Sequence, residues 1–317
     1  MARKDPLDGK LVTLIGGNGF LGRHVAEKLL AGGARLRIAA RHPEKALRLK
    51  PLANLGQLQF ARCNVASKDS IEACVAGSDA VAYLVGTFDG DQEALQARGA
   101  GYAAAAARAT GASAFVYVSA IGANADDEES GYARTKGEGE QLVLDAFPKA
   151  TILRPSVMFG EDDDFINMFA GLISTLPVLP VFAPESPLQP LWVDDGAEAL
   201  FTALSDPGKH GGKTYELGGP DVITMEALHQ QIAAAQQRKR TFVPVPDALG
   251  SLFAALPLTP MNGDQWTLLK RGNVTGGTLP GFDKLGIAPK PLSLFLEDWM
   301  VRYRTHGRFT QKKPSAA

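Results

Sequence analysis

Three polar side chains near the middle of the chain have the types and spacing that acid–base chemistry requires. Ser119 ends an apolar, strand-like run, and Tyr132 and Lys136 follow on a segment with helical spacing. Residues four apart lie on one face of a helix, so the phenol and the ammonium are expected to be neighbours. An adjacent ammonium lowers the pKa of tyrosine from its usual value of about 10, which makes the phenol usable as a general acid or base. Ser119 could orient a carbonyl or hydroxyl group, although the same Tyr–Lys spacing also occurs on any helix with a half-buried tyrosine and an exposed lysine.

A glycine-rich turn near the N-terminus predicts a nucleotide site. The sequence from Gly16 to Gly22 reads Gly-Gly-Asn-Gly-Phe-Leu-Gly and lies between a strand-like run at 11–16 and a helical pattern at 20–31. In a strand–turn–helix unit, one glycine permits the tight turn. A second lets backbone N–H groups approach a pyrophosphate at the helix N-terminus, and a third allows close packing of the helix. Because the motif stands in this context, we expect it to bind a dinucleotide.

The end of the second predicted strand indicates which dinucleotide is bound. An acidic side chain about 20 residues after the glycines would hydrogen-bond to the 2′-hydroxyl of the adenosine ribose. The sequence there is Ala39-Ala40-Arg41-His42-Pro43 and contains no acid. A guanidinium at Arg41 can hold a 2′-phosphate by paired, charge-assisted hydrogen bonds. NADP(H) is therefore favoured over NAD(H), with a solvated surface arginine as the alternative interpretation.

The elements that must position these residues alternate between strand and helix patterns. Strands are predicted at 11–16, 35–40, 57–61, 79–85, 114–119 and 149–154, and helices at 20–31, 68–76, 92–110 and 131–146. Six such units predict an α/β fold, a Rossmann-type doubly wound parallel sheet covered on both faces. Beyond it the pattern loosens, with helices expected at 195–205, 224–237 and 291–304. We expect an NAD(P)-binding Rossmann domain at 8–160, a smaller substrate or docking lobe at 161–309 interleaved with it, and a flexible tail at 310–317.

Composition argues against several other classes of protein. The chain of 317 residues is 45% hydrophobic, which is enough for a full α/β core. Its 33 basic and 34 acidic residues are spread without the basic stripe that a nucleic-acid-binding protein needs. The five histidines lack metal-ligand spacing, and Cys63 and Cys74 are expected to be small core residues in a reducing compartment. Residues 1–10 resemble neither a secretory signal nor a transit peptide, so the cytoplasm is the expected location.

Two apolar stretches and the end of the chain are candidates for docking. The stretch 166–182 contains Asn167 and two prolines, and it is shorter than the roughly 20 uninterrupted apolar residues of a membrane-spanning helix. The stretch 249–258 is similarly apolar, and residues 299–313 interleave aromatic and basic side chains. Burial within the second lobe is one interpretation of these segments. The other is a surface for a membrane interface or a protein partner.

Further motifs extend the pattern over nearly the whole chain. They are Val-Ser-Ala-Ile-Gly-Ala at 118–123, the segment 132–140, Leu-Arg-Pro-Ser-Val-Met-Phe-Gly at 153–160, Trp-Val-Asp-Asp at 192–195, Asp-Asp-Phe-Ile-Asn at 163–167, Asp-Gln-Trp-Thr-Leu-Leu-Lys at 264–270 with Asn273, and Leu-Gly-Ile-Ala-Pro-Lys-Pro at 285–291. With the glycine turn, the chain resembles the extended and atypical short-chain dehydrogenase/reductase superfamily. The last three motifs are more particular to the branch that contains the nucleotide-binding accessory subunit of respiratory complex I (NADH:ubiquinone oxidoreductase) and its bacterial relatives.

The resemblance implies roles for individual residues. Ser119, Tyr132 and Lys136 fall on the family's catalytic positions, and Pro155 falls on the loop against the nicotinamide. Asn64 replaces the acid that usually follows the third strand and contacts adenine, but its side chain can still hydrogen-bond. The asparagine that active members carry in the helix lining the catalytic site is not evident in 96–101. The cofactor positions implied are Gly16, Asn18, Gly19, Phe20, Leu21, Gly22, Arg41, Asn64, Val65, Val85, Lys136 and Pro155.

Two functions of different classes are consistent with these features. In the first, an NADP(H)-binding accessory or assembly-type subunit of the respiratory chain holds its nucleotide structurally. It contacts complex I subunits or the membrane surface, peripheral on the cytoplasmic face of the inner membrane. In the second, an active NADP(H)-dependent oxidoreductase or epimerase acts on a carbonyl or hydroxyl substrate. The C-terminal motifs favour the first function and the intact Ser119, Tyr132 and Lys136 favour the second; we give preference to the first.

Overall fold

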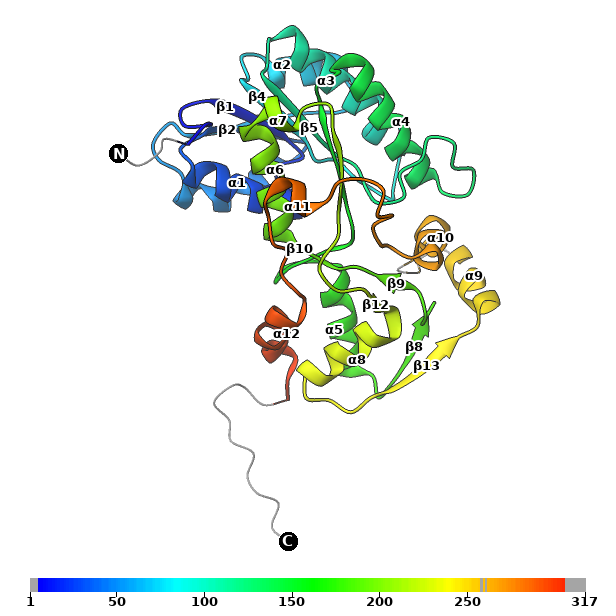
Figure 1. The fold of residues 1–317 in the computed structure, drawn as a ribbon. Coiled ribbons are helices and arrows are strands. Elements are labelled where there is room, and N and C mark those ends of the chain that lie inside the picture. The colour runs from blue at the N-terminus through cyan, green and yellow to red at the C-terminus, as the bar shows by residue number, and fades with distance from the viewer. Residues whose placement is uncertain (1–4, 257–258, 260, 306–317) are drawn as a thin grey trace.

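A parallel sheet of seven strands forms the centre of the larger lobe (Figure 1). The computed structural model describes residues 5–256, 259 and 261–305. The strands lie in the order β11-β6-β5-β4-β1-β2-β3, and each neighbouring pair is parallel, which confirms the Rossmann-type prediction. They are β1 (Leu11–Ile15), β2 (Arg35–Ala40), β3 (Leu58–Arg62), β4 (Ala80–Tyr83), β5 (Ala114–Val118), β6 (Thr151–Pro155) and β11 (Thr214–Leu217).

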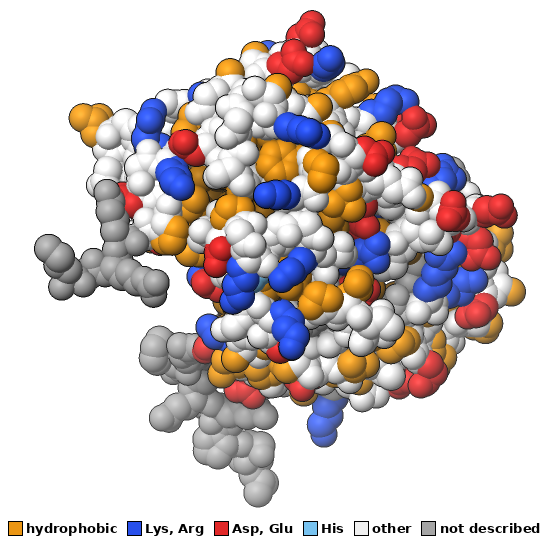
Figure 2. Space-filling model, turned by 45° about the horizontal axis from the view of Figure 1, so that its top comes forward, with side chains coloured by type: hydrophobic (Ala, Val, Ile, Leu, Met, Phe, Trp, Pro, Cys, Tyr) orange, Lys and Arg blue, Asp and Glu red, His pale blue; other side chains and the backbone are white. Residues whose placement is uncertain are grey.

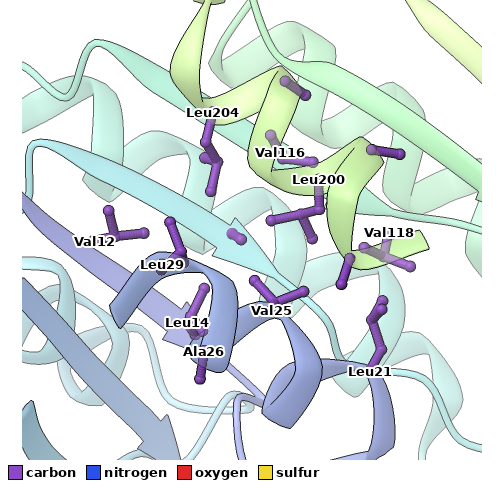
Figure 3. Close-up of a cluster of buried hydrophobic side chains, with 14 of the residues drawn as sticks. Val12, Leu14, Leu21, Val25, Ala26, Leu29, Val116, Val118, Leu200 and Leu204 are labelled. Carbon is purple, nitrogen blue, oxygen red and sulfur yellow. The ribbon is translucent and has the colours of Figure 1, made fainter. Parts of the chain in front are cut away.

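Helices cover both faces of this sheet because its central strands are apolar on both sides. One face packs against α1 (Phe20–Ala31), η1 (Pro43–Leu52), α6 (Val193–Ser205) and α11 (Phe282–Leu285), and the other against α2 (Lys68–Val75), α3 (Gly99–Ala109) and α4 (Gly131–Ala146). Burying a Val or Leu side chain contributes about 1.5–3 kcal/mol to the stability of the fold. Figure 3 shows part of the first interface, where Leu21, Val25 and Leu29 of α1 and Leu200 and Leu204 of α6 surround Val12, Leu14, Val116 and Val118 of the sheet.

The seventh strand, β11, corrects the prediction of six strand units. Its sequence is Thr-Tyr-Glu-Leu, which is too short and too polar to stand out as a strand. It pairs with β6, from which some 60 residues separate it, so that Thr214 lies beside Ile152 and Leu217 beside Pro155. Tyr215 and Leu217 are each 1% exposed, so the strand is stabilised by the sheet and core that it joins.

The second lobe is built from short strands and helices around its own apolar core. Its strands form three pairs: β7 (Met158–Phe159) with β10 (Leu191–Trp192), β8 (Val178–Phe182) with β13 (Thr241–Val245), and β9 (Pro187–Leu188) with β12 (Ile223–Thr224). Its helices are α5 (Phe165–Thr175), α8 (Met225–Ala235), α9 (Asp247–Ala255), α10 (Gly263–Arg271) and α12 (Ser293–Met300), followed by the short η3 (Val301–Tyr303). Side chains of α5, β8, α8 and α12 form the core of this lobe.

Several helices differ from their predicted extents. The helix predicted at 92–110 begins as a π-helical turn, η2 (Glu93–Arg98), and continues as α3, while the helix predicted at 291–304 divides into α12 and η3. Neither η1 nor the short α7 (Pro207–His210) was predicted. The predicted tail at 310–317 and the last residues of the stretch 249–258 lie outside the described residues. Within the described ranges, no helix is long and apolar enough to cross a membrane.

Candidate functional site

The topology of the large sheet places a crevice beside the glycine turn. Strand order reverses between β1 and β4, and ligands of such sheets bind outside the carboxyl ends of the strands at this switch point. A pocket of about 290 Å³ lies there. Its lining residues are Gly16, Asn18, Gly19, Ala39, Ala40, Arg41, His42, Lys45, Cys63, Val65, Leu84, Val85, Gly86, Thr87 and Leu95. A second cavity, of about 570 Å³, lies between α8 and α12, remote from the glycine turn and from Tyr132.

The glycine turn lies between this pocket and the N-terminus of α1. Gly16 has φ +83°, a conformation that favours glycine, and its N–H donates to the carbonyl of Ala39 on the neighbouring strand. A Cβ on Gly22 would lie 2.6 Å from the backbone of Gly17, so α1 approaches the turn more closely than a side chain would allow. Gly19 precedes α1 and supplies no side-chain cap. The first N–H groups of α1 therefore remain available to an anion.

Two cationic side chains line the pocket near the carboxyl end of β2. Arg41 follows β2, and Lys45 lies on η1; both are exposed and both line the pocket. The carbonyl of the intervening His42 accepts a hydrogen bond from Asn18 Nδ2 at 3.1 Å, which ties this end to the glycine turn. Lys45 was not among the predicted site residues. The unpredicted element η1 brings it there, and a basic residue four positions after Arg41 was the available sequence signal.

Six of the predicted cofactor residues line this pocket, and six do not. Gly16, Asn18, Gly19, Arg41, Val65 and Val85 line it, whereas Phe20, Leu21, Gly22, Asn64, Lys136 and Pro155 lie outside its walls. Asn64 is exposed, and its Oδ1 accepts the N–H of Ala66 at 3.2 Å. Pro155 ends β6, where its carbonyl accepts the N–H of Ile121. The pocket is therefore lined by the predicted glycine turn and by Arg41 at the end of β2. Lys136 and Pro155, which were expected next to the nicotinamide, do not line it.

Ser119, Tyr132 and Lys136 lie together where β5 meets α4. The Nζ of Lys136 donates to the carbonyls of Val118 and Val85, at 2.9 and 3.0 Å, and lies 5.9 Å from the centre of the Tyr132 ring. Lys136 is 2% exposed and Ser119 is 3% exposed. The Oγ of Ser119 has no hydrogen-bond partner among the described residues. A buried, unpartnered hydroxyl beside a buried ammonium is a feature that calls for a functional or ligand-related explanation.

Burial shifts the pKa values of Lys136 and Tyr132. It lowers the pKa of the Lys136 ammonium to about 7. It raises the pKa of the Tyr132 phenol to about 12, and the nearby Asp264 carboxylate adds to the increase. The sequence predicts a phenol whose pKa is lowered by its lysine neighbour. In the structure the opposite holds, because desolvation outweighs the ammonium, whose hydrogen bonds go to backbone carbonyls.

Side chains from both lobes cover Tyr132. The ring of Phe88 stacks on the ring of Tyr132 with a centre-to-centre distance of 4.3 Å. On α10 of the second lobe, Asp264 Oδ2 accepts the backbone N–H of Tyr132 at 3.0 Å, and it also accepts from Gln92 Nε2 at 3.4 Å. Asn262, which precedes α10, donates to the Phe88 carbonyl at 3.4 Å. These contacts hold Phe88 and α10 against Tyr132, whose side chain stays partly exposed.

The other end of α10 is clamped to the larger lobe as well. The guanidinium of Arg271 binds Asp127 through two nitrogens and Glu129 through one, the last at 2.7 Å. The Arg271 guanidinium and two backbone N–H donors hold the pKa of the Asp127 carboxyl at about 2. Two residues beyond α10, the Oδ1 of Asn273 accepts the N–H of Val157 at 2.6 Å. The motif 264–273 is therefore a strap between the lobes.

Gln96 is a buried polar residue that sequence reasoning did not assign. It lies in the π-helical turn η2, is 0% exposed, and its Nε2 donates to Thr135 Oγ1 at 3.1 Å. Its Oε1 accepts the N–H of Thr87 at 3.2 Å, and Thr87 lines the pocket. Isolated π turns within helices are frequent at functional sites. Gln96 thus supplies an amide in the segment 96–101, where an asparagine was sought.

Charged side chains of both signs lie on the molecular surface. On the face shown in Figure 2, basic and acidic side chains are interspersed and no single sign dominates. Within the ranges that the structure describes, no group of three or more His, Cys, Asp or Glu side chains could hold a metal ion. The candidate site consists of the glycine turn, the two cations Arg41 and Lys45, and the group of buried Ser119, buried Lys136 and half-buried Tyr132.

Comparison with known proteins identifies similar chains and folds. Residues 16–167 match a family described as NAD(P)H-binding. The chain is 31% identical to the mouse (Mus musculus) "NADH dehydrogenase (ubiquinone) 1 alpha subcomplex subunit 9, mitochondrial", over 96% of this chain and 83% of the relative. It is 28% identical to the protein of the same name from Arabidopsis thaliana, over 96% and 80% of the two chains.

Among solved structures, the fold is similar to an NADPH-dependent quinone oxidoreductase from Escherichia coli complexed with NADPH. The TM-score is 0.73 at 20% identity, over 90% of this chain and 99% of the other. It is also similar to a nucleoside-diphosphate-sugar epimerase from Staphylococcus aureus, with a TM-score of 0.72 at 17% identity over 90% and 99%. These likenesses concern the fold.

Proposed function

Because this chain belongs to the family of NADH dehydrogenase (ubiquinone) 1 alpha subcomplex subunit 9, we propose that it is a nucleotide-holding subunit or assembly protein of the respiratory chain. In this function the larger lobe, built on the seven-stranded sheet, holds a dinucleotide as a structural ligand. The second lobe, with α5, α8, α9, α10 and α12, docks the protein onto a membrane-bound assembly such as complex I, at the cytoplasmic face of the inner membrane. The part of this chain that matches the NAD(P)H-binding family spans residues 16–167.

The preferred dinucleotide in this proposal is NADP(H). Arg41 and Lys45 both line the end of the pocket where the ribose 2′-position would lie, and the end of β2 carries no carboxylate. Two cations suit a dianionic phosphate, whereas a ribose hydroxyl alone leaves them without an anionic partner. Because both side chains are exposed, the preference is expected to be moderate and to weaken as salt is added.

The raised pKa of Tyr132 and the ring stacked on it carry the proposal of a structural rather than a catalytic nucleotide. A general acid needs a pKa near the working pH. The Tyr132 phenol has a pKa of about 12, Phe88 stacks on its ring, and Asp264 binds its backbone N–H. A nucleotide in the pocket would then mainly stabilise the larger lobe.

The proposed docking surface consists of exposed apolar side chains on the second lobe. Residues 165–182 and 248–262 contain no Asp, Glu, Lys or Arg. Part of each segment is core: Ile166, Ala170, Ile173 and Ala254 are buried. Of the fourteen exposed large hydrophobic side chains among the described residues, eight lie in or next to these segments: Met168, Leu172, Leu176, Val178, Val243, Leu249, Leu252 and Leu256.

The spacing of these side chains supports docking by helix faces. On α5, Met168, Leu172 and the adjoining Leu176 are four residues apart, and on α9, Leu249 and Leu252 are separated by three, so each set lies on one face. Lys239 is exposed two residues before β13, which pairs with β8. An exposed apolar surface of this kind suits the interface of a membrane or of a membrane-bound partner.

The test compares two leucine substitutions on the full-length protein in its native host. Leu252→Asp charges the exposed face of α9, and Leu55→Asp is the control because Leu55 is fully exposed on the other lobe. We expect the first variant to leave the membrane fraction and to be lost from pull-downs of complex I subunits, while the control remains associated. A starting protein found entirely in the soluble fraction, without complex I subunits, contradicts the proposal.

A second candidate function is favoured by the unpartnered hydroxyl of Ser119. In a working reductase or epimerase, Ser119 would orient a carbonyl, Tyr132 would pass a proton to its oxygen, and Lys136 would stabilise the phenolate. The buried Oγ of Ser119 has the free hydrogen-bonding capacity that orienting a carbonyl needs. The candidate requires the pKa of the Tyr132 phenol to fall from about 12 towards the working pH, and turnover of a small carbonyl compound by the purified protein would establish it.

A further inference from the structure

Two buried tyrosines of the large sheet bind carbonyls of the π-helical turn η2. The phenol of Tyr83, on β4, donates to the carbonyl of Leu95, and that of Tyr117, on β5, donates to the carbonyl of Gln96 at 3.0 Å. Both tyrosines are 0% exposed, so their hydroxyls have no access to water and depend on these two carbonyls. The bonds fix the backbone of η2 against β4 and β5. The place of the Gln96 side chain is therefore determined by the sheet.

The amide of Gln96 is bonded at both ends. Its Nε2 donates to Thr135 Oγ1 at 3.1 Å, and its Oε1 accepts the N–H of Thr87 at 3.2 Å. A backbone N–H can only donate, so it must face the oxygen of the amide. Thr135 is 2% exposed on α4 and donates its own proton to the Gly131 carbonyl at 2.8 Å, which leaves its oxygen free to accept. A chain of hydrogen bonds therefore runs from α4 through Gln96 to Thr87.

Thr87 belongs to a wall of the nucleotide pocket that lies between regular elements. Val85, Gly86 and Thr87 line the pocket, after the end of β4 and before the start of η2, and are here called the 85–87 wall. At one end, Lys136 Nζ donates to the Val85 carbonyl at 3.0 Å, and at the other Gln96 accepts the Thr87 N–H. A Cβ on Gly86 would lie 3.4 Å from Lys136 Nζ and 3.7 Å from Gln96 Oε1. The wall thus has a buried side-chain anchor at each end.

The glycine turn lies directly against the 85–87 wall. A Cβ on Gly16 would be 3.1 Å from Val85 Cγ2 and 3.3 Å from the Val85 nitrogen. The N–H of Gly16 donates to the Ala39 carbonyl, which holds the turn to β2. Because the turn and the wall both line the pocket, a dinucleotide that fills it contacts both. A wall that is loose in the empty protein must be ordered when the ligand binds, which weakens binding.

We propose that Gln96 and Thr135 are positioning residues of the nucleotide pocket, which hold the 85–87 wall in the place where a dinucleotide binds. The inference rests on the proposed nucleotide site and adds to it two residues that do not line the pocket. Gln96 acts on the ligand through Thr87, and Thr135 acts through Gln96. Without the bond to Thr87, the wall is free to move in the empty protein. A neutral hydrogen bond of this kind corresponds to about a three- to tenfold change in Kd.

The experiment titrates the full-length protein and its variants with NADP⁺ and measures their unfolding in urea alongside. Gln96→Leu removes the whole amide. Thr135→Val replaces the hydroxyl by a methyl group of similar size, whereas Thr135→Ser keeps the hydroxyl. We expect about a three- to tenfold higher Kd in Gln96→Leu and in Thr135→Val. Thr135→Ser should bind within about twofold of the starting protein, because Gln96 keeps its acceptor.

Gln57→Leu is the matched control. Gln57 is also a buried glutamine, 7% exposed, and its amide donates to the carbonyls of Leu30 and Ala34 at 2.9 and 2.8 Å. It precedes β3 and so lies at the amino end of the strand, whereas the pocket lies outside the carboxyl ends. Gln57→Leu should lower the free energy of unfolding while the Kd of NADP⁺ stays within about twofold.

Amide hydrogen exchange, followed by NMR in the protein without nucleotide, tests the wall itself. The Thr87 amide should be protected in the starting protein because Gln96 accepts its proton. We expect this protection to be lost in Gln96→Leu and kept in Gln57→Leu.

Four results would overturn the inference. Unchanged Kd values in Gln96→Leu and Thr135→Val, in a starting protein that binds NADP⁺, refute it and leave the proposed function in place. An equal loss of affinity in Gln57→Leu assigns the effect to general stability. A Thr87 amide that exchanges as fast in the starting protein as in Gln96→Leu contradicts the anchor. A starting protein that binds no dinucleotide refutes the proposed function and the inference with it.

Discussion

The cationic end of the pocket yields a quantitative prediction about cofactor preference. Replacing Arg41 by Ala removes one charge-assisted partner of a 2′-phosphate, and such a hydrogen bond contributes about 1.5–3 kcal/mol. Since Arg41 and Lys45 are both exposed, solvent screening argues for the lower end of this range. A loss of about 1.5 kcal/mol is about a tenfold increase in the Kd of NADPH. The Kd of NADH should change by less than about twofold, because its ribose carries no phosphate to lose.

Fluorescence or calorimetric titration of the purified protein with each cofactor measures both constants. Lys45→Ala should weaken NADPH binding as Arg41→Ala does, and Arg41→Glu should abolish or reverse the preference by repelling the phosphate and accepting a hydrogen bond from the ribose. Arg48→Ala is a matched control. Arg48 lies on the same element η1, is equally exposed and binds Asp162, but it does not line the pocket.

Three outcomes would refute this reasoning. Equal affinities of the starting protein for NADPH and NADH would show that the two cations do not meet a phosphate. A loss in Arg41→Ala that is the same for both cofactors would assign Arg41 to the common part of the nucleotide. A preference that does not weaken between low and high salt would argue against an exposed electrostatic contact.

Three further predictions concern the buried group, the interlobe strap and the glycine turn. Tyr132→Phe should abolish any turnover that the protein shows while its dinucleotide Kd stays nearly unchanged, as single-turnover assays and titrations can compare. Asp127→Asn should cost about 1–2 kcal/mol of unfolding free energy at pH 7, because the folded pKa of Asp127 is held at about 2. A lowered folded pKa stabilises above the unfolded value, so urea titrations should show this difference fading as pH falls from about 4 towards 2. Gly19→Leu should remove nucleotide-dependent stabilisation, about 4 kcal/mol at a thousandfold excess over Kd, with little change without nucleotide, as thermal shifts can test.

The part of the fold that sequence reasoning predicted is the part governed by local pattern. Of the first six strands, β1, β4 and β5 are apolar runs next to turn signals, as buried parallel strands need, while β2 and β3 alternate apolar with polar residues. The strand β11 escaped because only its pairing with β6 makes Thr-Tyr-Glu-Leu a strand. The helix α5 was seen as an apolar stretch and not as a helix, since its buried and exposed faces are both hydrophobic and the helical period is hidden.

In the candidate site, too, the parts that depend on local motifs were predicted and the parts that depend on long-range contacts were not. The glycine turn and Arg41 are adjacent in sequence to the elements that position them, so a motif was sufficient to place them in one pocket. The contacts of Asp264 with Tyr132 join residues 132 positions apart, which no local pattern reveals. The raised pKa of Tyr132 was also missed, because it depends on burial and on the direction in which the Lys136 ammonium points.

The late position of β11 in the chain affects how the protein can be made. The sheet is completed only after residue 217 has been synthesised, and α6, which covers one face of that sheet, ends at Ser205. Until then a nascent chain exposes the unpaired edge of β6 and the apolar face that α6 later covers, and both favour aggregation. A fragment that ends near residue 160 would keep this exposure permanently. Expression of the nucleotide-binding part alone should therefore depend on chaperones. A protein shortened from its C-terminus should keep α6 and β11, the elements that cover and complete the first sheet.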